Sequence, residues 1–390
     1  EWAPQKAIWT AWPWDANEWN GDLAAPRRDV AELVRTLVAT NTVRVLVNGD
    51  EAEATARAAI GQAAELVPAK YGDIWLRDTG PIFARAGNGS IALRFAVNGW
   101  GGKHDLADDA TVGDRIAELT GTGIRRFDFV LEGGAVEHDG EGTVLATRQT
   151  LLNPNRNGWT EEAAEAALKQ AFGAKKVIWV DEGLIGDHTD GHIDNIARFV
   201  GPGRVACQAP ADANDPHAAI LDAIADGLSR QTDAAGRTLE VIRIPAPGRV
   251  TDAAGEVLPA SHMNFIIANE VVVVPVYGTA TEAAALDALR AYVWPGLAYP
   301  TATDVHRLVD RESGLRVTAQ THVGGHHQRS LAMQRSLFEG QTREAAAAGF
   351  DIAYRRLWSY QFALREALFR LRMLDTVQFT LTHRNRSGRR

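Results

Sequence analysis

The segment "DHTDGHIDN" at residues 187–195 combines histidine, carboxylate and amide side chains in a stretch that has no helical period. His192 and Asp194 are two residues apart, so on a β-strand both side chains would leave the same face. A carboxylate beside an imidazole can hold a cation and shift the pKa of its neighbour. The segment is therefore a candidate for acid–base chemistry on a cationic ligand.

A second candidate carboxylate lies in "DIWLRDTGP" at residues 73–81. The pattern predicts that Trp75, Arg77 and Asp78 lie at the end of a strand, where Thr-Gly-Pro forces a turn. Catalytic carboxylates are often placed at such turns, because loops on a rigid scaffold carry functional groups. Taken alone, an aspartate in this position more often binds the backbone amides of its own turn.

Three other polar segments have simpler interpretations. The Gly-rich stretches "NGWGGK" (98–103) and "LEGGAVEHDGEG" (131–142) do not fit a phosphate-binding pattern. "LLNPNRN" (151–157) predicts a turn whose asparagines satisfy a loop. In "HTDGHIDN" the alternating His and Asp residues include His188 and Asp190, which are metal-binding types, but they lack the recurrent zinc spacings. We therefore expect no metal at this segment.

The elements that must position these residues repeat one plan of strand, tight polar turn, strand and helix. Four such turns occur, in "RAGNGSIALRF", "EHDGEGTVLAT", "FVGPGRVACQ" and "IIANEVVVVP", and each predicts a hairpin. Helical stretches follow them at residues 109–120, 160–172, 216–231 and 281–292. The units recur about every 50–65 residues, which suggests a radial or stacked repeat. Residues 7–60 add a strand–helix–strand–helix set, and a ring of such units would protect the sheet edges. An open α/β sheet is the alternative.

Composition narrows the class of protein. The chain has 390 residues, of which 45% are hydrophobic and 23% charged, as in globular proteins. The net charge of −8 argues against nonspecific nucleic-acid binding and favours a cationic ligand. No apolar run is long enough to span a membrane. The single cysteine, Cys207, rules out an internal disulfide, so we expect a cytoplasmic protein and a buried free thiol.

The order of the motifs W-x-R-D-T-G-P, N-G-W-G-G, E-G-G, L-L-N-P-N-R-N and D-G-H-I-D-N closely resembles agmatine deiminase, over roughly residues 2–290. The resemblance implies the five-bladed α/β propeller of the guanidino-modifying superfamily. It implies hydrolysis of agmatine to N-carbamoylputrescine and ammonia, a step toward putrescine, without a metal or organic cofactor. It leaves a homo-oligomer open.

The resemblance also assigns roles to residues. Asp78 and Asp194 match the two aspartates that bind the guanidinium, and His192 matches the general acid and base. Trp75 matches the aromatic residue at the guanidinium or its alkyl stem. Glu132 and Asp190 match positions at the pocket wall.

The nucleophile of this family is a cysteine in a Gly-Gly-Gly-x-x-His-Cys motif near the C-terminus, and this sequence does not contain that motif. "HVGGHHQ" (322–328) is vaguely similar to it but has no thiol. Cys207, in "GRVACQAP", matches no catalytic position of the family.

The last part of the chain has a different character. Lysine stops after Lys176, and the segment 292–380 resembles the C-terminal end of a cyclopropane-fatty-acid-synthase-type methyltransferase. The matching stretches are W-P-G-L, S-G-L-R-V, L-W-S-Y, F-R-x-R and V-Q-F-T-L, with Tyr360 at that family's active-site tyrosine. The Gly-rich cofactor loop of such enzymes is absent. We expect an incomplete propeller over residues 1–291 and a methyltransferase-like fragment over 292–390.

These observations give a leading hypothesis and two alternatives. The leading hypothesis is an agmatine deiminase-type hydrolase that lacks the family thiol. The first alternative is a guanidinium-binding pseudoenzyme or a chimeric reading frame, because Asp78, His192 and Asp194 are present without the thiol. The second is an S-adenosylmethionine-dependent lipid methyltransferase fragment, which binding of that cofactor would reveal.

Overall fold

The computed structural model divides the chain into two compact units, residues 1–297 and 298–390. The described residues are 2–87, 89–252, 254–279, 281, 284–286, 305–306, 309, 315–349, 352, 355, 358–359, 362–363, 366, 369–370 and 376–383. The expected boundary after residue 291 lies outside them and stays a prediction. Among the described residues, no helix has both the length and the apolarity needed to cross a bilayer.

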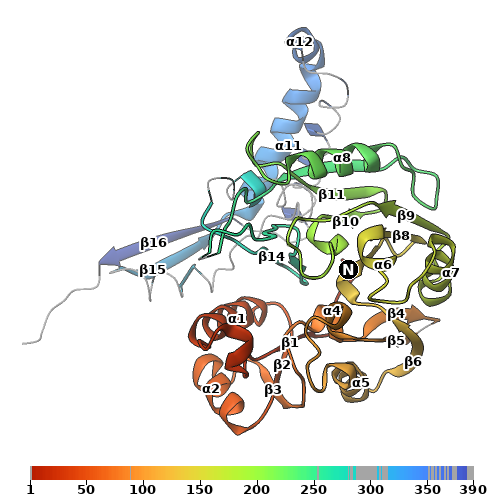
Figure 1. Ribbon diagram of the computed structural model, residues 1–390. Coiled ribbons are helices and arrows are strands. Elements are labelled where there is room, and N and C mark those ends of the chain that lie inside the picture. Colours follow the sequence, from red (N-terminus) through yellow and green to blue (C-terminus); the bar gives the residue numbers. More distant parts are fainter. Residues whose placement is uncertain are drawn as a thin grey trace, which may run out of the picture. The chain divides into compact units, whose positions relative to one another are not determined.

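The first sheet is parallel and consists of three strands with two connecting helices (Figure 1). Its elements are β1 (Ile8–Ala11), α1 (Ala24–Leu37), β2 (Val43–Val47), α2 (Asp50–Ile60) and β3 (Glu65–Pro68), with a 3₁₀ turn η1 (Ala16–Trp19). α1 buries Val30, Val34 and Leu37, which recur at helical spacing and pack with Val45 of β2. The predicted strand–helix–strand–helix set is thus confirmed.

Three further sheets repeat one topology, in which an antiparallel hairpin leads through a helix to a third strand parallel to the second. The second sheet has β4 (Ile82–Ala86), β5 (Gly89–Ala96), α5 (Asp109–Thr120) and β6 (Gly123–Val130). The third has β7 (Val136–His138), β8 (Thr143–Thr147), α6 (Arg148–Leu151), α7 (Glu161–Phe172) and β9 (Lys176–Val180). The fourth has β10 (Ala197–Gly201), β11 (Arg204–Ala209), α8 (Ala218–Ser229) and β12 (Glu240–Pro245).

A capping side chain and a left-handed glycine set the two ends of α7, one of the helices of these units. The hydroxyl of Thr160 accepts a hydrogen bond from the amide of Ala163 and so caps α7, which stops at Gly173 in the left-handed conformation with φ 65°. The helices predicted at 109–120, 160–172 and 216–231 are confirmed as α5, α7 and α8.

The fourth predicted hairpin is also present, as β13 (Ile266–Ile267) and β14 (Val272–Val273). It contacts the beginning of the chain: the Gln5 amide donates to Asn269 Oδ1 and the Gln5 side chain donates to the Ile267 carbonyl, both at 2.7 Å. Ala268 lies in the apolar core of the first sheet. Most of the helix expected at 281–292 lies outside the described residues.

Buried apolar clusters join these sheets in chain order. Separate clusters join β1–β3 to α5, the second sheet to the third, the third to the fourth, the fourth to β13, and the β13–β14 turn to the first sheet. The packing order therefore returns to its start. Each sheet of the described residues is open, with two or three strands, so no closed sheet is present in that part of the chain.

The second unit contains an antiparallel pair, β15 (Leu315–His322) with β16 (Val377–His383), and the helices α11 (Gly324–Gly340) and α12 (Thr342–Ala347). The strand predicted from V-Q-F-T-L is confirmed as β16. The "HVGGHHQ" stretch runs from the end of β15 into α11. Tyr360 lies outside the described residues.

Candidate functional site

The proposed site residues lie on loops and short turns, and the strand end predicted for Trp75, Arg77 and Asp78 is wrong. Asp78 lies in the single helical turn α3 (Leu76–Thr79), where the Gly80 amide donates to the Leu76 carbonyl at 3.0 Å. His192 directly precedes the 3₁₀ turn η3 (Ile193–Asn195).

The reason for the second turn is local. One oxygen of Asp187 accepts hydrogen bonds from the backbone amide and the hydroxyl of Thr189, at 2.9 and 2.6 Å. This side chain-to-backbone contact replaces a strand ladder. Asp190 and Gly191 then adopt left-handed φ values of 64° and 79°, which end any extended run.

Asp78, His192 and Asp194 nevertheless converge on one point, the α-carbon of Gly134 in η2 (Gly133–Ala135). A Cβ at residue 134 would lie 2.6 Å from His192 Nδ1 and 2.7 Å from both Asp194 Oδ2 and Asp78 Oδ1. The Gly134 amide donates to Asp78 Oδ1 at 2.8 Å, and His192 Nδ1 lies 3.8 Å from that oxygen. Only glycine permits this close approach, so the E-G-G motif provides the floor of the site.

The second oxygen of Asp78 accepts a 2.8 Å hydrogen bond from the indole nitrogen of Trp100, a residue that the motif analysis did not single out. Trp100 is 3% exposed and lies in the short turn α4 (Gly99–Gly102) with φ 52°. A bulky residue rarely adopts this left-handed conformation. The signal in the sequence was the glycine-flanked tryptophan of N-G-W-G-G, because such turns recur where backbone strain serves a site.

The carboxylate and imidazole at the centre are buried, with His192 2% and Asp194 4% exposed. Within the described residues, His192 Nε2 and Asp194 Oδ1 have no hydrogen-bond partner. Burial raises the pKa of Asp194 to about 6, and the neighbouring Arg77 and His192 oppose this rise. Arg77 Nε lies 3.8 Å from Asp194 Oδ2, while its Nη2 donates to Glu137 at 2.8 Å. Buried polar atoms without partners are expensive, so these two atoms, on side chains that meet at Gly134, make this point a candidate ligand position.

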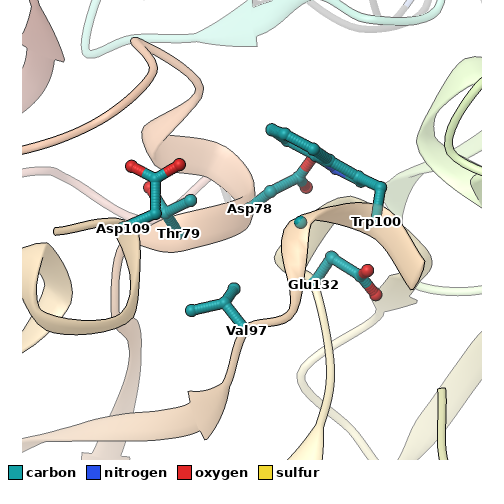
Figure 2. Close-up of a pocket in the computed structure, with 7 residues that line it drawn as sticks. Asp78, Thr79, Val97, Trp100, Asp109 and Glu132 are labelled. Carbon is teal, nitrogen blue, oxygen red and sulfur yellow. The ribbon is translucent and has the colours of Figure 1, made fainter. Parts of the chain in front are cut away.

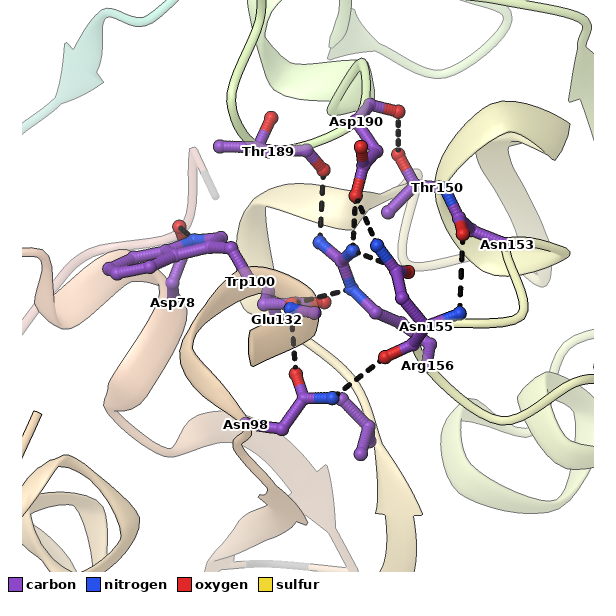
Figure 3. A network of polar contacts seen from close by, with 12 residues as sticks. Asp78, Asn98, Trp100, Glu132, Thr150, Asn153, Asn155, Arg156, Thr189 and Asp190 are labelled. Carbon is purple, nitrogen blue, oxygen red and sulfur yellow. Dashed lines mark hydrogen bonds and ion pairs between the residues drawn. The ribbon is translucent and has the colours of Figure 1, made fainter. Parts of the chain in front are cut away.

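Glu132 and Asp190 are close to this centre but are engaged by the protein itself (Figure 3). Arg156 Nε donates to Glu132 Oε1 at 2.9 Å, and Arg156 Nη1 pairs with Asp190 Oδ2. Lys103 Nζ donates to the other oxygen of Asp190 at 2.6 Å. Burial raises the pKa of Asp190, but the hydrogen bonds from Lys103, Asn155 and Arg156 outweigh it and hold the pKa below its usual value.

The "LLNPNRN" turn thus has the structural role that its sequence predicted. Asn157 Oδ1 accepts from the Val130 amide and its Nδ2 donates to the Val130 carbonyl, both at 2.9 Å. The Asn98 side chain donates to the Asn155 carbonyl at 2.9 Å. The part that Arg156 has in this turn was not predicted from the sequence.

A small cavity of about 10 Å³ lies beside Asp78, with room for one water molecule (Figure 2). Its lining residues are Asp78, Thr79, Val97, Gly99, Trp100, Asp109 and Glu132. Glu132 is one of these lining residues, and its Oε2 has no hydrogen-bond partner among the described residues. Trp75 directly precedes α3 and is 49% exposed, and its role at a substrate stem stays a prediction.

The remaining candidate groups are used for packing. In the described part of the chain, no three His, Cys, Asp or Glu side chains gather in a way that could hold a metal ion. The ring of His188 packs edge-on against Trp100 and His104, with centroids 5.9 and 5.7 Å apart. Cys207 is on β11, fully buried in the core between the third and fourth sheets, and burial raises its pKa to about 12. The prediction of a buried free thiol is confirmed.

Comparison with known proteins places this chain among the deiminases. The model of the family described as Porphyromonas-type peptidyl-arginine deiminase matches residues 1–298, and the chain belongs to that family. The agmatine deiminase of Stutzerimonas stutzeri (strain A1501) is 34% identical over 315 residues, covering 74% of this chain and 86% of that protein.

Solved structures agree with this assignment. The agmatine deiminase of Enterococcus faecalis superimposes with a TM-score of 0.71 and 29% identity, covering 75% of this chain and 86% of that one. A cysteine-to-serine variant of the C. jejuni agmatine deiminase with substrate bound gives a TM-score of 0.68 and 26% identity, with coverage of 75% and 86%. These neighbours are α/β pentein propellers. The family match ends at residue 298, and these matches give no support to the methyltransferase resemblance expected for residues 292–380.

Proposed function

We propose that the centre around Gly134 binds the guanidinium group of agmatine and serves its hydrolysis to N-carbamoylputrescine and ammonia. The observation that carries the proposal is the convergence of Asp78, His192 and Asp194 on one glycine, with two buried polar atoms of His192 and Asp194 left without partners in the described residues. Membership of a deiminase family supports the reaction class.

The chemistry of the ligand fits these groups. A guanidinium is planar, permanently charged and carries five N–H donors, which carboxylates accept in pairs. Asp194 Oδ1 is available to such a donor, and both oxygens of Asp78 are fixed in place by Trp100 and Gly134. A cation of this kind would also offset the cost of burying the Asp194 charge. Trp75 is proposed to contact the guanidinium or its alkyl stem, because an aromatic face attracts a cation and packs against apolar groups.

His192 is proposed to transfer the protons. Its Nδ1 lies 3.8 Å from Asp78 Oδ1, and its Nε2 has no hydrogen-bond partner within the described residues. As an acid it would protonate the ammonia that leaves the guanidinium carbon, and as a base it would activate the incoming water. In the family this reaction proceeds through a cysteine thioether, and Cys207 is in the core instead.

A second candidate function, guanidinium binding without appreciable turnover, is favoured by that position of Cys207. The chain has one cysteine, and it is fully buried. Asp78, His192 and Asp194 alone would bind and polarise the substrate without forming a covalent intermediate. The two functions differ in whether bound agmatine releases ammonia.

We also propose that the sheets of the first unit are blades of a five-bladed propeller, supported by the packing order that returns to the first sheet. The single cysteine supports a cytoplasmic location, where thiols stay reduced. Self-association into a homo-oligomer remains a proposal that sedimentation would test.

The proposed function is tested by calorimetric titration of the full chain with agmatine and with putrescine, which has the amine but no guanidinium. We expect agmatine to bind and putrescine to bind much more weakly, and Asp194→Asn to remove the difference. Ammonia release, measured in parallel, separates turnover from binding. Equal binding of the two ligands, or no binding of either, would contradict the assignment of the site.

A further inference from the structure

Arg156 occupies a pocket built for a guanidinium group inside the protein. Its side chain is 0% exposed. Besides Glu132 and Asp190, it donates from Nη1 to Asn155 Oδ1 at 2.9 Å and from Nη2 to the Thr189 carbonyl at 3.0 Å (Figure 3). Every nitrogen of the guanidinium therefore has a partner. A buried charge with such complete pairing costs a protein little, whereas one left unpaired would cost much.

The partners of Arg156 belong to the loops that carry the proposed site. Glu132 lies two residues before Gly134, the floor of the site. Thr189 and Asp190 lie just before His192 and Asp194 in the same turn.

The third loop is the one that holds Trp100. A Cβ at Gly101 would come within 2.7 Å of Arg156 Nη1, so the backbone beside Trp100 lies directly against the guanidinium. In Figure 3 the guanidinium lies between these segments, with Trp100 and Asp78 beside it.

We propose that Arg156 is a positioning residue with two roles. It aligns the three loops that carry Trp100, Gly134 and His192. It also pairs with the neighbouring carboxylates Glu132 and Asp190, so that the substrate binds Asp78 and Asp194. The second role, pairing with the carboxylates that would otherwise attract substrate, rests on the proposed function. The first role, the alignment of the loops, is independent of any ligand.

The geometry explains why an arginine is needed here. The acceptors lie in three directions around one plane, and a guanidinium presents donors in a planar fork. A lysine has a single ammonium group and cannot reach Glu132, Thr189 and Asp190 together. Lys103 already supplies one ammonium to Asp190 from the solvent side. Arg156→Lys would therefore keep the positive charge but lose the planar fork of hydrogen-bond donors.

The test compares Arg156→Lys and Arg156→Ala with a matched control, Arg148→Lys. Arg148 also pairs with two carboxylates, Glu161 and Asp181, but its side chain is 36% exposed. The first readout needs no ligand: the NMR signal of the Trp100 indole N–H, assigned with Trp100→Phe, reports the hydrogen bond to Asp78. We expect both Arg156 variants to move this signal and the control to leave it unchanged.

The second readout is agmatine affinity, with added guanidinium ion as a chemical rescue. We expect Arg156→Lys to weaken binding roughly tenfold or more, as loss of hydrogen bonds to charged groups does. In the wild-type chain guanidinium should only compete with agmatine. In Arg156→Ala it should first strengthen agmatine binding, because it refills the vacated pocket, and then compete at higher concentration.

The outcomes separate the two proposals. If the wild-type chain binds no agmatine, the proposed function fails and the indole signal alone decides the role of Arg156. If the wild type binds agmatine and Arg156→Lys matches it in affinity and indole signal, Arg156 is not a positioning residue. Should Arg156→Ala fail to fold, the lysine variant still decides.

Discussion

The indole nitrogen of Trp100 lies 2.8 Å from Asp78 Oδ2 and donates a hydrogen bond to it, from a backbone with φ 52°. The conformation is unfavourable for a bulky residue, and the surrounding glycines and the buried packing maintain it. The bond directs one oxygen of Asp78, while the Gly134 amide directs the other. The carboxylate thus has a fixed orientation before any ligand arrives, which reduces the entropic cost of binding.

Trp100→Phe should keep most of the packing and remove this hydrogen bond. Because the acceptor is a charged group, we expect a loss of about 1.5–3 kcal/mol in agmatine binding, which is roughly tenfold or more in Kd. Trp179→Phe is the matched control, because it removes an indole hydrogen bond of 3.3 Å to Glu165 on α7. Calorimetry of both variants would contradict the prediction if they weakened binding equally.

Gly134→Ala should abolish agmatine binding. The new methyl group would lie within 2.7 Å of polar atoms of Asp78, His192 and Asp194, so the site must open or the loops must shift. We expect a destabilisation of about 1–3 kcal/mol, the usual cost of overpacking. Gly227→Ala on α8 meets open space and should raise stability by roughly 0.5–1 kcal/mol with agmatine binding unchanged. Chemical denaturation and calorimetry measure both effects, and normal agmatine affinity in Gly134→Ala would refute the close approach.

The repeated hairpins and helices could be predicted because their signals are local. Gly, Asn, Asp and Pro between β-branched runs specify a hairpin, and Thr160 with Gly173 bounds α7. The local structure around Asp78 and His192 could not be predicted in this way. There, side chains such as Asp187 bind the backbone and form turns that the residue pattern does not specify.

The residue types of the site were visible in the sequence, but their contacts were not. Asp78 and Asp194 are distant in the chain, and their meeting at Gly134 depends on how three loops pack. Glu132 and Asp190 were expected at the pocket wall, and the structure gives them Arg156 as an internal partner. Only tertiary contacts show which carboxylates are already paired with a cationic side chain of the protein.

Agmatine affinity should fall as pH decreases through about 6. Burial raises the pKa of Asp194 to about 6, against the influence of Arg77 and His192. The ligand guanidinium stays charged over this range, so protonation of Asp194 removes its attraction. Calorimetry between about pH 5 and pH 8 should show this loss in the wild type, and Asp194→Asn should bind weakly at every pH. Equal wild-type affinity at both ends would contradict it.

The stability of the ligand-free chain should change in the opposite direction over the same range. The folded pKa of Asp194 lies above the unfolded value of about 3.9, so the folded state binds more protons between these values. The stabilisation from this group is therefore present at low pH and is lost as pH rises toward about 6. Asp73, whose pKa burial also raises to about 6, adds to the same trend. As pH rises, Asp194→Asn and Asp73→Asn should each lose less free energy of unfolding than the wild type loses. Only Asp194→Asn should impair agmatine binding.

Cys207→Ala should leave ammonia release unchanged. The thiol is fully buried among the side chains of the third and fourth sheets, and burial raises its pKa to about 12, so it is not an available thiolate. We expect wild type and variant to release ammonia from agmatine at the same rate, because a thiol buried in this core takes no part in the reaction. The variant should lose about 1 kcal/mol of stability from the small cavity that it creates. Robust release that the substitution abolishes would make Cys207 the nucleophile and refute this description of the site. Robust release that survives it would indicate water activated directly by His192, and His192→Asn should then eliminate it.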